Sequence, residues 1–395
     1  MIIRSLLDTD IYKFSMMQVV LHQFPGAEVE YRFRCRSQGV DLTALVPDLE
    51  REIDHLCSLK LTDDELQYLA TLRYLKSDFV EFLRLFHLQA RFIHIDIVDG
   101  QLDLRIRGPW LHTILFEVPL LAIISELYAR HAFPDHDLAE GRRRLAEKID
   151  QIRALDQPDA FIFADFGTRR RFSRRWHDEV VQTLAEAVPG SLRGTSNLRL
   201  ARQFDLVPIG TMAHEFIQAC QALGPRLAES QRFAFEVWAR EYRGDLGIAL
   251  SDTYSLKAFL RDFDLYFCKL FDGARQDSGD PFVWAEAMIA HYRANRIDPR
   301  TRNLIFSDSL SIPKAAAIWE RFRDQTSISF GIGTNLTNDT GAAPINIVIK
   351  MTECNGQPVV KLSDSPGKVV STDQAYLAWV RQAFDVHEPG QSAEG

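Results

Sequence analysis

The stretch Phe161-Ile162-Phe163-Ala164-Asp165-Phe166-Gly167-Thr168-Arg169 decides how this chain folds, because a short apolar run passes directly into a polar, glycine-containing cluster. The apolar run is typical of a buried strand, and the cluster is typical of the loop that follows one. The same arrangement recurs, and each time a segment with helical periodicity comes after it. The further apolar runs lie at residues 191–192, 207–209, 247–250, 265–267, 303–306 and 327–330.

A parallel series of strands and helices in which every strand ends in polar residues favours a TIM-like barrel, because the loops of a barrel converge on one face and hold the site there. An open doubly wound sheet is the alternative, but no G-x-G-x-x-G follows the first strand. We therefore predict an α/β fold, with an irregular TIM-like α/β barrel over residues 136–345.

The flanking segments predict an additional α+β domain, an open-faced sandwich. Residues 28–36 alternate apolar and charged side chains, and residues 92–106 form two alternating runs around Asp99-Gly100, which predicts a hairpin. We assign residues 1–135 to this domain, with helices at 42–86 and 117–130. Residues 346–395 are expected to give a hairpin at Asn355-Gly356, a helix and a flexible tail after His387, and their strands are expected to complete the N-terminal domain.

Composition narrows the function further. The chain has 395 residues, 46% hydrophobic and 25% charged, with a formal net charge of −8, so its summed field favours neither nucleic acid nor anionic membrane. The longest apolar run, Val118 to Ile124, is too short to span a bilayer. The five cysteines are scattered without Cys-x-x-Cys spacing, as in a reduced, cytoplasmic protein.

His214 and Asp252 are the candidate catalytic pair. Each follows one of two successive predicted strands, so the carboxylate can orient one imidazole nitrogen and leave the other free as a nucleophile. A lone histidine in this position is more often structural, and only the nearby aspartate favours the catalytic interpretation.

Other strand ends carry candidate phosphate and ribose contacts. Two glycines in Gly331-Ile332-Gly333-Thr334 allow backbone N–H groups to approach a phosphate, although they also suit a tight turn. Arg169 can clamp a carboxylate or phosphate, whereas Arg171 can be an ordinary solvated charge. Asp277 and Asp308 can contact ribose or Mg²⁺, and Asp280 is interpreted as the N-cap of the helix that opens with Pro281. For Asp8 and Asp10, helix capping is the simpler interpretation.

The chain resembles the nicotinate phosphoribosyltransferase family along essentially its whole length. The resemblance rests on the motifs at residues 7–13 (LDTDIYK), 33–36 (FRCR), 165–173 (DFGTRRRFS), 194–197 (GTSN), 210–215 (GTMAHE), 277–281 (DSGDP), 306–308 (FSD), 330–334 (FGIGT) and 361–368 (KLSDSPGK).

This resemblance implies an enzyme that forms nicotinate mononucleotide and pyrophosphate from nicotinate and phosphoribosyl pyrophosphate. It implies ATP as a co-substrate, spent through a phosphohistidine at His214, and Mg²⁺ held mainly through pyrophosphate, with Asp277 as a further ligand and no fixed protein metal site. It also implies a homodimer with shared active sites, in which the neighbouring chain supplies Tyr12 and the pyridine ring stacks between Tyr12 and Phe166.

The resemblance also assigns the remaining contacts. Arg275 is expected to reach the nicotinate carboxyl group, and Thr195 and Ser196 are expected to line the nicotinate site. The implied contacts of phosphoribosyl pyrophosphate are Arg169, Asp277, Asp308, Gly331, Gly333 and Thr334.

Three alternatives remain at this stage. Nicotinamide phosphoribosyltransferases share several motifs but carry an acid where this chain has Ser196, so we expect the acid substrate. A quinolinate-using enzyme needs no phosphorylatable histidine here. A catalytically inactive barrel that acts as a ligand sensor would be expected to lack some of these residues.

Overall fold

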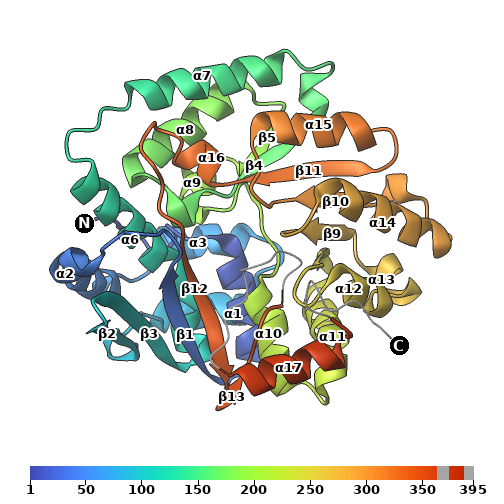
Figure 1. The fold of residues 1–395 in the computed structure, drawn as a ribbon, viewed down its shortest axis with the longest axis horizontal. Coiled ribbons are helices and arrows are strands. Elements are labelled where there is room, and N and C mark those ends of the chain that lie inside the picture. Colours follow the sequence, from blue (N-terminus) through green and yellow to red (C-terminus); the bar gives the residue numbers. More distant parts are fainter. Residues whose placement is uncertain (363–372, 387–395) are drawn as a thin grey trace.

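The protein is built around two β-sheets, one parallel and one antiparallel (Figure 1). The structure is a computed structural model and describes residues 1–362 and 373–386. The larger sheet has seven strands, all parallel, in the order β6-β5-β4-β11-β10-β9-β8. The sheet is curled, and its edge strands β6 and β8 share no ladder in the described residues. The strands are β4 (Phe163–Asp165), β5 (Leu192–Thr195), β6 (Val207–Pro208), β8 (Ile248–Leu250), β9 (Gly273–Gln276), β10 (Asn303–Phe306) and β11 (Ser327–Ile332).

This arrangement confirms the predicted α/β fold and its irregular barrel. Helices follow the strands and lie around the outside of the sheet, as α7, α8, α14 and α15 do in Figure 1. They are α7 (Ala139–Arg153), α8 (Arg174–Ala187), α9 (Leu198–Gln203), α10 (His214–Leu223), α11 (Ser230–Tyr242), α12 (Leu256–Asp262), α14 (Pro281–Ala294), α15 (Ile312–Phe322) and α16 (Thr334–Thr337), with η4 (Pro158–Ala160), η5 (Thr168–Arg170), η6 (Leu227–Glu229) and η7 (Pro299–Thr301), and the short strand β7 (Arg243–Leu246).

One predicted strand is wrong. Leu265-Tyr266-Phe267 begins the helix α13 (Leu265–Leu270), and the strand of this unit is β9, which starts at Gly273. Asp264 caps the helix, because its carboxylate accepts hydrogen bonds from the backbone N–H groups of Tyr266 and Phe267. The cap outweighs the aromatic side chains, which on their own favour a strand.

The smaller sheet is antiparallel, with the order β13-β12-β1-β3-β2. Its central strand β1 pairs with β3 on one side and with β12 on the other, so segments about 320 residues apart lie side by side. The predicted hairpins are confirmed, with Asp99-Gly100 and Asn355-Gly356 all at positive φ in the turns. The strands are β1 (Glu28–Cys35), β2 (Ile93–Val98), β3 (Gln101–Pro109), β12 (Ile347–Cys354) and β13 (Gln357–Pro358).

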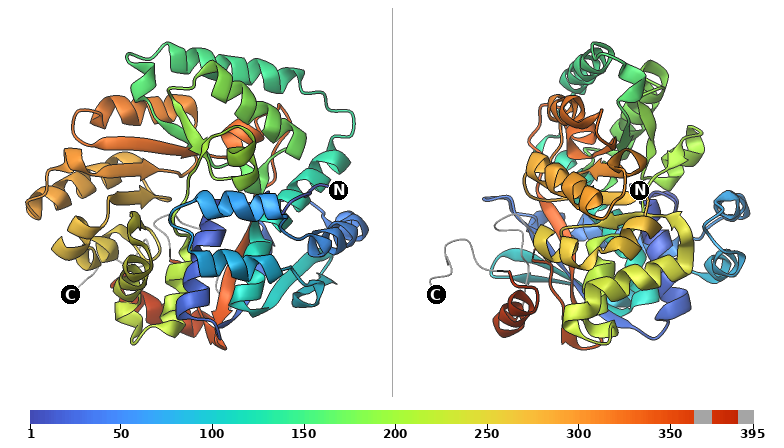
Figure 2. Two further views of the ribbon diagram at one scale, coloured as in Figure 1. Left: turned by 180° about the vertical axis from the view of Figure 1, so that it is seen from behind. Right: turned by 90° about the vertical axis from the view of Figure 1, so that its right-hand side faces the viewer.

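Helices cover this second sheet. Seen from behind, α3 and α4 lie in front of α1 (Figure 2). The helices are α1 (Ile11–Gln23), α2 (Val46–Ser58), α3 (Asp63–Thr71), α4 (Ser77–Leu85), α5 (Trp110–Thr113), α6 (Glu117–Ala132) and α17 (Gln374–Ala383), with η1 (Thr43–Leu45), η2 (Ala90–Phe92) and η3 (Ile114–Phe116). The division of the chain after residues 135 and 345 stays a prediction, and the predicted tail after His387 lies outside the described residues.

The segment Trp110–Ala132 is long and apolar enough by composition to cross a membrane, but 94% of its most apolar window is buried inside the protein. Most side chains of α6 are buried on all sides, so this segment is a core helix covered by protein. All five cysteines are free thiols, as expected.

Candidate active site

The carboxyl ends of the parallel strands open into one cavity of about 620 Å³. Loops after β4, β6, β9, β10 and β11 contribute to its wall, and α1 and β12 close it from the side of the antiparallel sheet. The predicted residues that line it are Tyr12, Phe166, Arg169, His214, Arg275, Asp277, Asp308, Gly331, Gly333 and Thr334. Strand ends that lie far apart in the sequence therefore line one cavity, as the sequence predicted.

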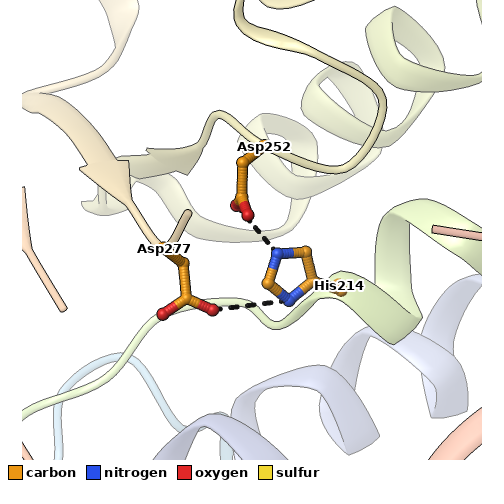
Figure 3. A group of neighbouring side chains, drawn as sticks. All are labelled: His214, Asp252 and Asp277. Carbon is orange, nitrogen blue, oxygen red and sulfur yellow. Dashed lines mark hydrogen bonds and ion pairs between the residues drawn. The ribbon is translucent and has the colours of Figure 1, made fainter. Parts of the chain in front are cut away.

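His214 and Asp252 form the predicted pair. The Nε2 of His214 lies 2.8 Å from Oδ1 of Asp252, and its Nδ1 lies 3.8 Å from Oδ2 of Asp277 (Figure 3). The other oxygen of Asp252 accepts hydrogen bonds from Lys361 Nζ and Ser278 Oγ, both at 2.6 Å. Asp252 itself does not line the cavity; it reaches the cavity through the histidine.

The electrostatics of the pair favour a neutral imidazole. Burial, assisted by Lys361, lowers the pKa of His214 to about 4, although Asp252 acts in the opposite direction. Burial opposes ionisation of Asp252, but Lys361 and His214 hold its pKa well below the ordinary value. Near neutral pH, His214 therefore carries one proton, on Nε2 facing the carboxylate, and its Nδ1 lone pair is free for nucleophilic attack.

His214, Asp252 and Asp277 bring three possible metal ligands within 4.8 Å of one another. Asp252 has no oxygen left for a cation, because His214 occupies Oδ1 while Lys361 and Ser278 occupy Oδ2. A hydrogen-bonded His–Asp pair explains this cluster better than a fixed metal tripod does. Asp277 and His214 both line the cavity, and Ser307 Oγ donates to Oδ1 of Asp277 at 2.8 Å.

Phe166 and Tyr12 are the aromatic side chains of the cavity wall. Tyr12 comes from α1 of the same chain, and its buried hydroxyl has no hydrogen-bond partner among the described residues. Within this single chain, Tyr12 already lines the cavity, and the expectation that a neighbouring chain supplies Tyr12 to the site stays a prediction. The homodimer itself stays a prediction.

Gly331 has a role that the sequence alone did not indicate. A Cβ at this position would come within 2.3 Å of the Phe166 ring, so only glycine lets the ring lie against the end of β11. A Cβ at Gly333 would lie 2.9 Å from the Phe166 carbonyl oxygen. The glycines thus seat the aromatic residue as well as leaving backbone accessible to a ligand.

The cavity is strongly cationic although the whole chain is acidic. Seven of its lining residues are cations and three are acids. The cations are Arg36, Arg144, Arg169, Arg170, Arg275, Lys350 and Lys361, and the acids are Asp277, Asp308 and Asp339. Such an excess of donors suits a ligand with several negative charges.

Two of these cations are poised for a ligand. Arg275 donates one guanidinium hydrogen bond to the Met212 carbonyl at 3.1 Å, while its buried Nε has no partner within the described part of the chain. Lys350 makes no side-chain hydrogen bond or ion pair there, and burial together with Lys361 lowers its pKa to about 8. The sequence analysis missed Lys350 and gave no role to Lys361, which it named only as part of the motif at residues 361–368. A lysine between the apolar residues Ile349 and Met351 was a usable signal for Lys350.

Thr195 and Ser196 do not line the cavity. Thr195 Oγ1 donates to Asp165 Oδ2 at 2.7 Å, and Ser196 Oγ donates to Asp10 Oδ1 at 2.8 Å. Ser196 places no acid at its own position, as the sequence analysis noted, but the carboxyl group of Asp10 lies beside it. Burial raises the pKa of Asp10, so this carboxyl group is more easily neutral than an exposed one.

The surface interpretation of Arg171 is also wrong. Its guanidinium is fully buried and donates to both oxygens of Asp8, at 2.7 and 2.8 Å. Asp8 therefore anchors the N-terminal segment to the loop after β4, and it does not cap α1. Asp10 does occupy the N-cap position of α1 but its side chain makes no capping bond, whereas Asp280 caps α14 as predicted.

Comparisons with known proteins identify the same family over nearly the whole chain. The nicotinate phosphoribosyltransferase (NAPRTase) family profile matches residues 161–388, and the NAPRTase N-terminal domain profile matches residues 7–125. Nicotinate phosphoribosyltransferase of Cupriavidus necator is 60% identical over 389 residues, covering 98% of this chain and 99% of that protein. The protein of the same name from Burkholderia ambifaria is 59% identical over 392 residues, covering 98% of both.

A solved structure has a closely similar fold. The crystal structure of nicotinate phosphoribosyltransferase from Vibrio cholerae superposes with a TM-score of 0.94 at 40% sequence identity, covering 98% of this chain and 95% of that one.

Proposed function

Because this chain belongs to the nicotinate phosphoribosyltransferase family, we propose a role in that reaction for each part of the cavity. The enzyme forms nicotinate mononucleotide and pyrophosphate from nicotinate and phosphoribosyl pyrophosphate. In this displacement the pyridine nitrogen forms a bond to C1 of the ribose while the bond from C1 to the pyrophosphate oxygen breaks. The site must orient the two reactants and stabilise the departing anion.

The nicotinate site lies at Phe166, Tyr12 and Arg275. The two aromatic rings offer faces for an electron-poor pyridine ring. Arg275 lines the cavity and donates one hydrogen bond to the protein, at the Met212 carbonyl, which supports a contact of the rest of its guanidinium with the substrate carboxylate. A carboxamide would satisfy this donor less well than a carboxylate, which favours nicotinate over nicotinamide.

Phosphoribosyl pyrophosphate occupies the cationic part of the cavity. Gly331, Gly333 and Thr334 receive the 5-phosphate at the end of β11, and Arg169 contacts the substrate. Asp277 and Asp308 offer oxygen ligands of the kind that suit ribose hydroxyls or Mg²⁺ together with phosphate oxygens. When bound, Mg²⁺ supplies neutralisation of pyrophosphate charge.

His214 is the residue that ATP phosphorylates. Nδ1 attacks the γ-phosphorus, the bond from that phosphorus to its bridging oxygen breaks, and ADP leaves, while Asp252 keeps the proton on Nε2. The observation that carries this proposal is the Asp252–His214 hydrogen bond of 2.8 Å, with Nδ1 turned towards Asp277, a residue of the cavity wall (Figure 3).

The test is to incubate the protein with nicotinate, phosphoribosyl pyrophosphate, Mg²⁺ and ATP and to measure mononucleotide, pyrophosphate and ADP. We expect mononucleotide formation linked to ATP hydrolysis in the wild type, and loss of that link in His214→Ala. Equal turnover with nicotinamide would refute the substrate choice, unchanged coupling in His214→Ala would refute the role of the histidine, and total inactivity would favour a ligand sensor.

We also propose that the protein works in the cytoplasm as a homodimer. The free cysteines support a reducing compartment. Light scattering would test the oligomeric state, and a monomer active at all concentrations would contradict the shared active site.

A further inference from the structure

A buried charge cluster behind the cavity wall has no part in the chemistry described so far. Its centre is Lys13, which directly follows Tyr12 in α1 and whose side chain is fully buried. The Nζ of Lys13 lies 2.5 Å from Oε2 of Glu117 and also pairs with Glu215. Burying a lysine and two glutamates is expensive unless every charge is paired, so this cluster requires a structural or functional explanation.

Each glutamate leads to a different part of the site. Glu215 directly follows His214 in α10, and its Oε1 accepts hydrogen bonds from Tyr31 OH at 3.2 Å and Trp110 Nε1 at 3.3 Å. Glu117, at the start of α6, has its Oε1 3.7 Å from NH1 of Arg169. The Lys13 cluster (Lys13, Glu117 and Glu215) therefore contains the residues that follow Tyr12 and His214 in the chain, and it contacts the side chain of Arg169.

Further bonds hold α1 against the loop that precedes His214. Ser15 Oγ donates to the Thr211 carbonyl at 2.7 Å, and the backbone N–H of Ala213 lies 3.4 Å from the sulfur of Met16. Ser15 and Met16 are fully buried and Thr211 and Ala213 are half-buried, so a shift of the first turn of α10 has to be taken up by α1. The position of Tyr12 and the ion pair of Arg169 are then tied to the state of His214.

We propose that the Lys13 cluster is the positioning element that transmits phosphorylation of His214 to Tyr12 and Arg169. Addition of a phosphoryl group at Nδ1 places new negative charge beside the start of α10 and changes the balance among Glu215, Lys13 and Glu117. Through this cluster, α1 changes the position of Tyr12 beside nicotinate, and Arg169 changes its position beside phosphoribosyl pyrophosphate. This inference rests on the proposed phosphohistidine and concerns how its effect reaches the substrates.

The test compares the effect of ATP in wild type and Glu215→Gln. The readout is the ratio of kcat/KM for mononucleotide formation with ATP to that without ATP, together with transfer of a radiolabelled γ-phosphate to the protein. We expect Glu215→Gln to accept the phosphoryl group as the wild type does, but to show a ratio reduced about tenfold, as for a typical coupling between sites. A ratio unchanged in the presence of normal phosphorylation would overturn the inference.

A second variant separates coupling from stability. Lys13→Met leaves two buried carboxylates without their cation and can fail to fold, whereas Lys13→Met combined with Glu215→Gln leaves Glu117 with Arg169 and restores the charge balance. We expect the double variant to recover the melting temperature lost in Lys13→Met, but to keep the reduced ATP ratio. Recovery of both quantities would show that the cluster only stabilises the fold.

A matched control is Glu241→Gln. Glu241 is another buried glutamate that pairs with a lysine, Lys76, and with His22, but it does not line the cavity. We expect it to lower the melting temperature without changing the ATP ratio, and an equal fall in its ratio would also overturn the inference. If the wild type shows no ATP effect and no phosphorylation, the proposed ATP coupling fails, and that outcome is distinct from failure of the Lys13 cluster.

Discussion

At the scale of single residues, the Asp252 carboxylate determines which imidazole nitrogen of His214 carries the proton. Its Oδ1 holds the Nε2 proton of the imidazole, while its Oδ2 is bonded to Lys361 and Ser278. We expect Asp252→Asn to lower the rate of His214 phosphorylation by a factor of about 10²–10⁴, because the amide no longer fixes the reactive tautomer. The measurement is single-turnover phosphoryl transfer from ATP, and a rate equal to that of the wild type would contradict the assignment.

Burial of neutral His214 also predicts how stability depends on pH. The folded pKa of about 4 lies below the ordinary 6.5, so between these values the unfolded chain binds more protons and stability rises with pH. Above pH 6.5 the histidine imposes no penalty, and as the pH falls to 4 it destabilises the fold by up to roughly 3 kcal/mol. We expect urea unfolding of His214→Gln to show a shallower loss of stability than wild type across this window, and parallel curves would show that the folded histidine is not held neutral.

Several residue roles could be predicted from sequence and others could not. His214, Asp252 and Arg275 lie where strand ends or motifs placed them, since a parallel sheet brings those ends together. Arg171 resembled a surface charge because its partner Asp8 is 163 positions away. Lys350 was missed for a similar reason, because β12 reaches the cavity only by pairing with β1 at the other end of the chain.

At the scale of elements, the end of β11 and the loop after β4 depend on each other through Gly331 and Phe166. Gly331→Ala places a methyl group in the ring of Phe166, which must turn away from its place in the cavity wall. We expect the KM for nicotinate to rise about tenfold or more, and stability to fall by about 1–3 kcal/mol.

Gly26→Ala is the matched control for this substitution, because a Cβ at Gly26 meets nothing within 4 Å. Its steady-state kinetics should equal those of the wild type. A Gly331→Ala enzyme with an unchanged KM for nicotinate would show that Phe166 does not position the substrate ring.

Helices and strands were predicted correctly from sequence where the local sequence signals agree. The prediction failed where a single N-cap residue determines whether a segment is a helix or a strand. β10 has the predicted bounds, and Asp280 with Pro281 begins α14 as expected. At residues 265–267 the apolar aromatic run favours a strand, but the two backbone bonds accepted by Asp264 fix a helix. The true strand, β9, contains Arg275 and is too short and polar for periodicity to reveal it.

At the scale of the whole molecule, the first and last parts of the described chain meet in one sheet, and this places cations from β12 and its surroundings against the barrel mouth. A protein of net charge −8 thus carries a cavity in which seven cations face three acids. Low-dielectric walls focus that local potential, so a polyanion is drawn into the cavity despite the overall charge.

This charge separation predicts different salt dependence for the two substrates. Phosphoribosyl pyrophosphate carries several negative charges and nicotinate carries one, so screening by salt must weaken binding of the former more strongly. Raising KCl from about 0.05 to about 0.5 M, which shortens the Debye length about threefold, should raise the KM for phosphoribosyl pyrophosphate by a clearly larger factor than the KM for nicotinate. Lys350→Met removes a half-buried cation that makes no hydrogen bond or ion pair in the described part of the chain, and it should reduce this salt effect as well as raise the KM for phosphoribosyl pyrophosphate. Arg226→Met is the control, because Arg226 is exposed and does not line the cavity. Equal salt effects on the two KM values in the wild type would mean that the cavity cations serve the fold and not the polyanionic substrate.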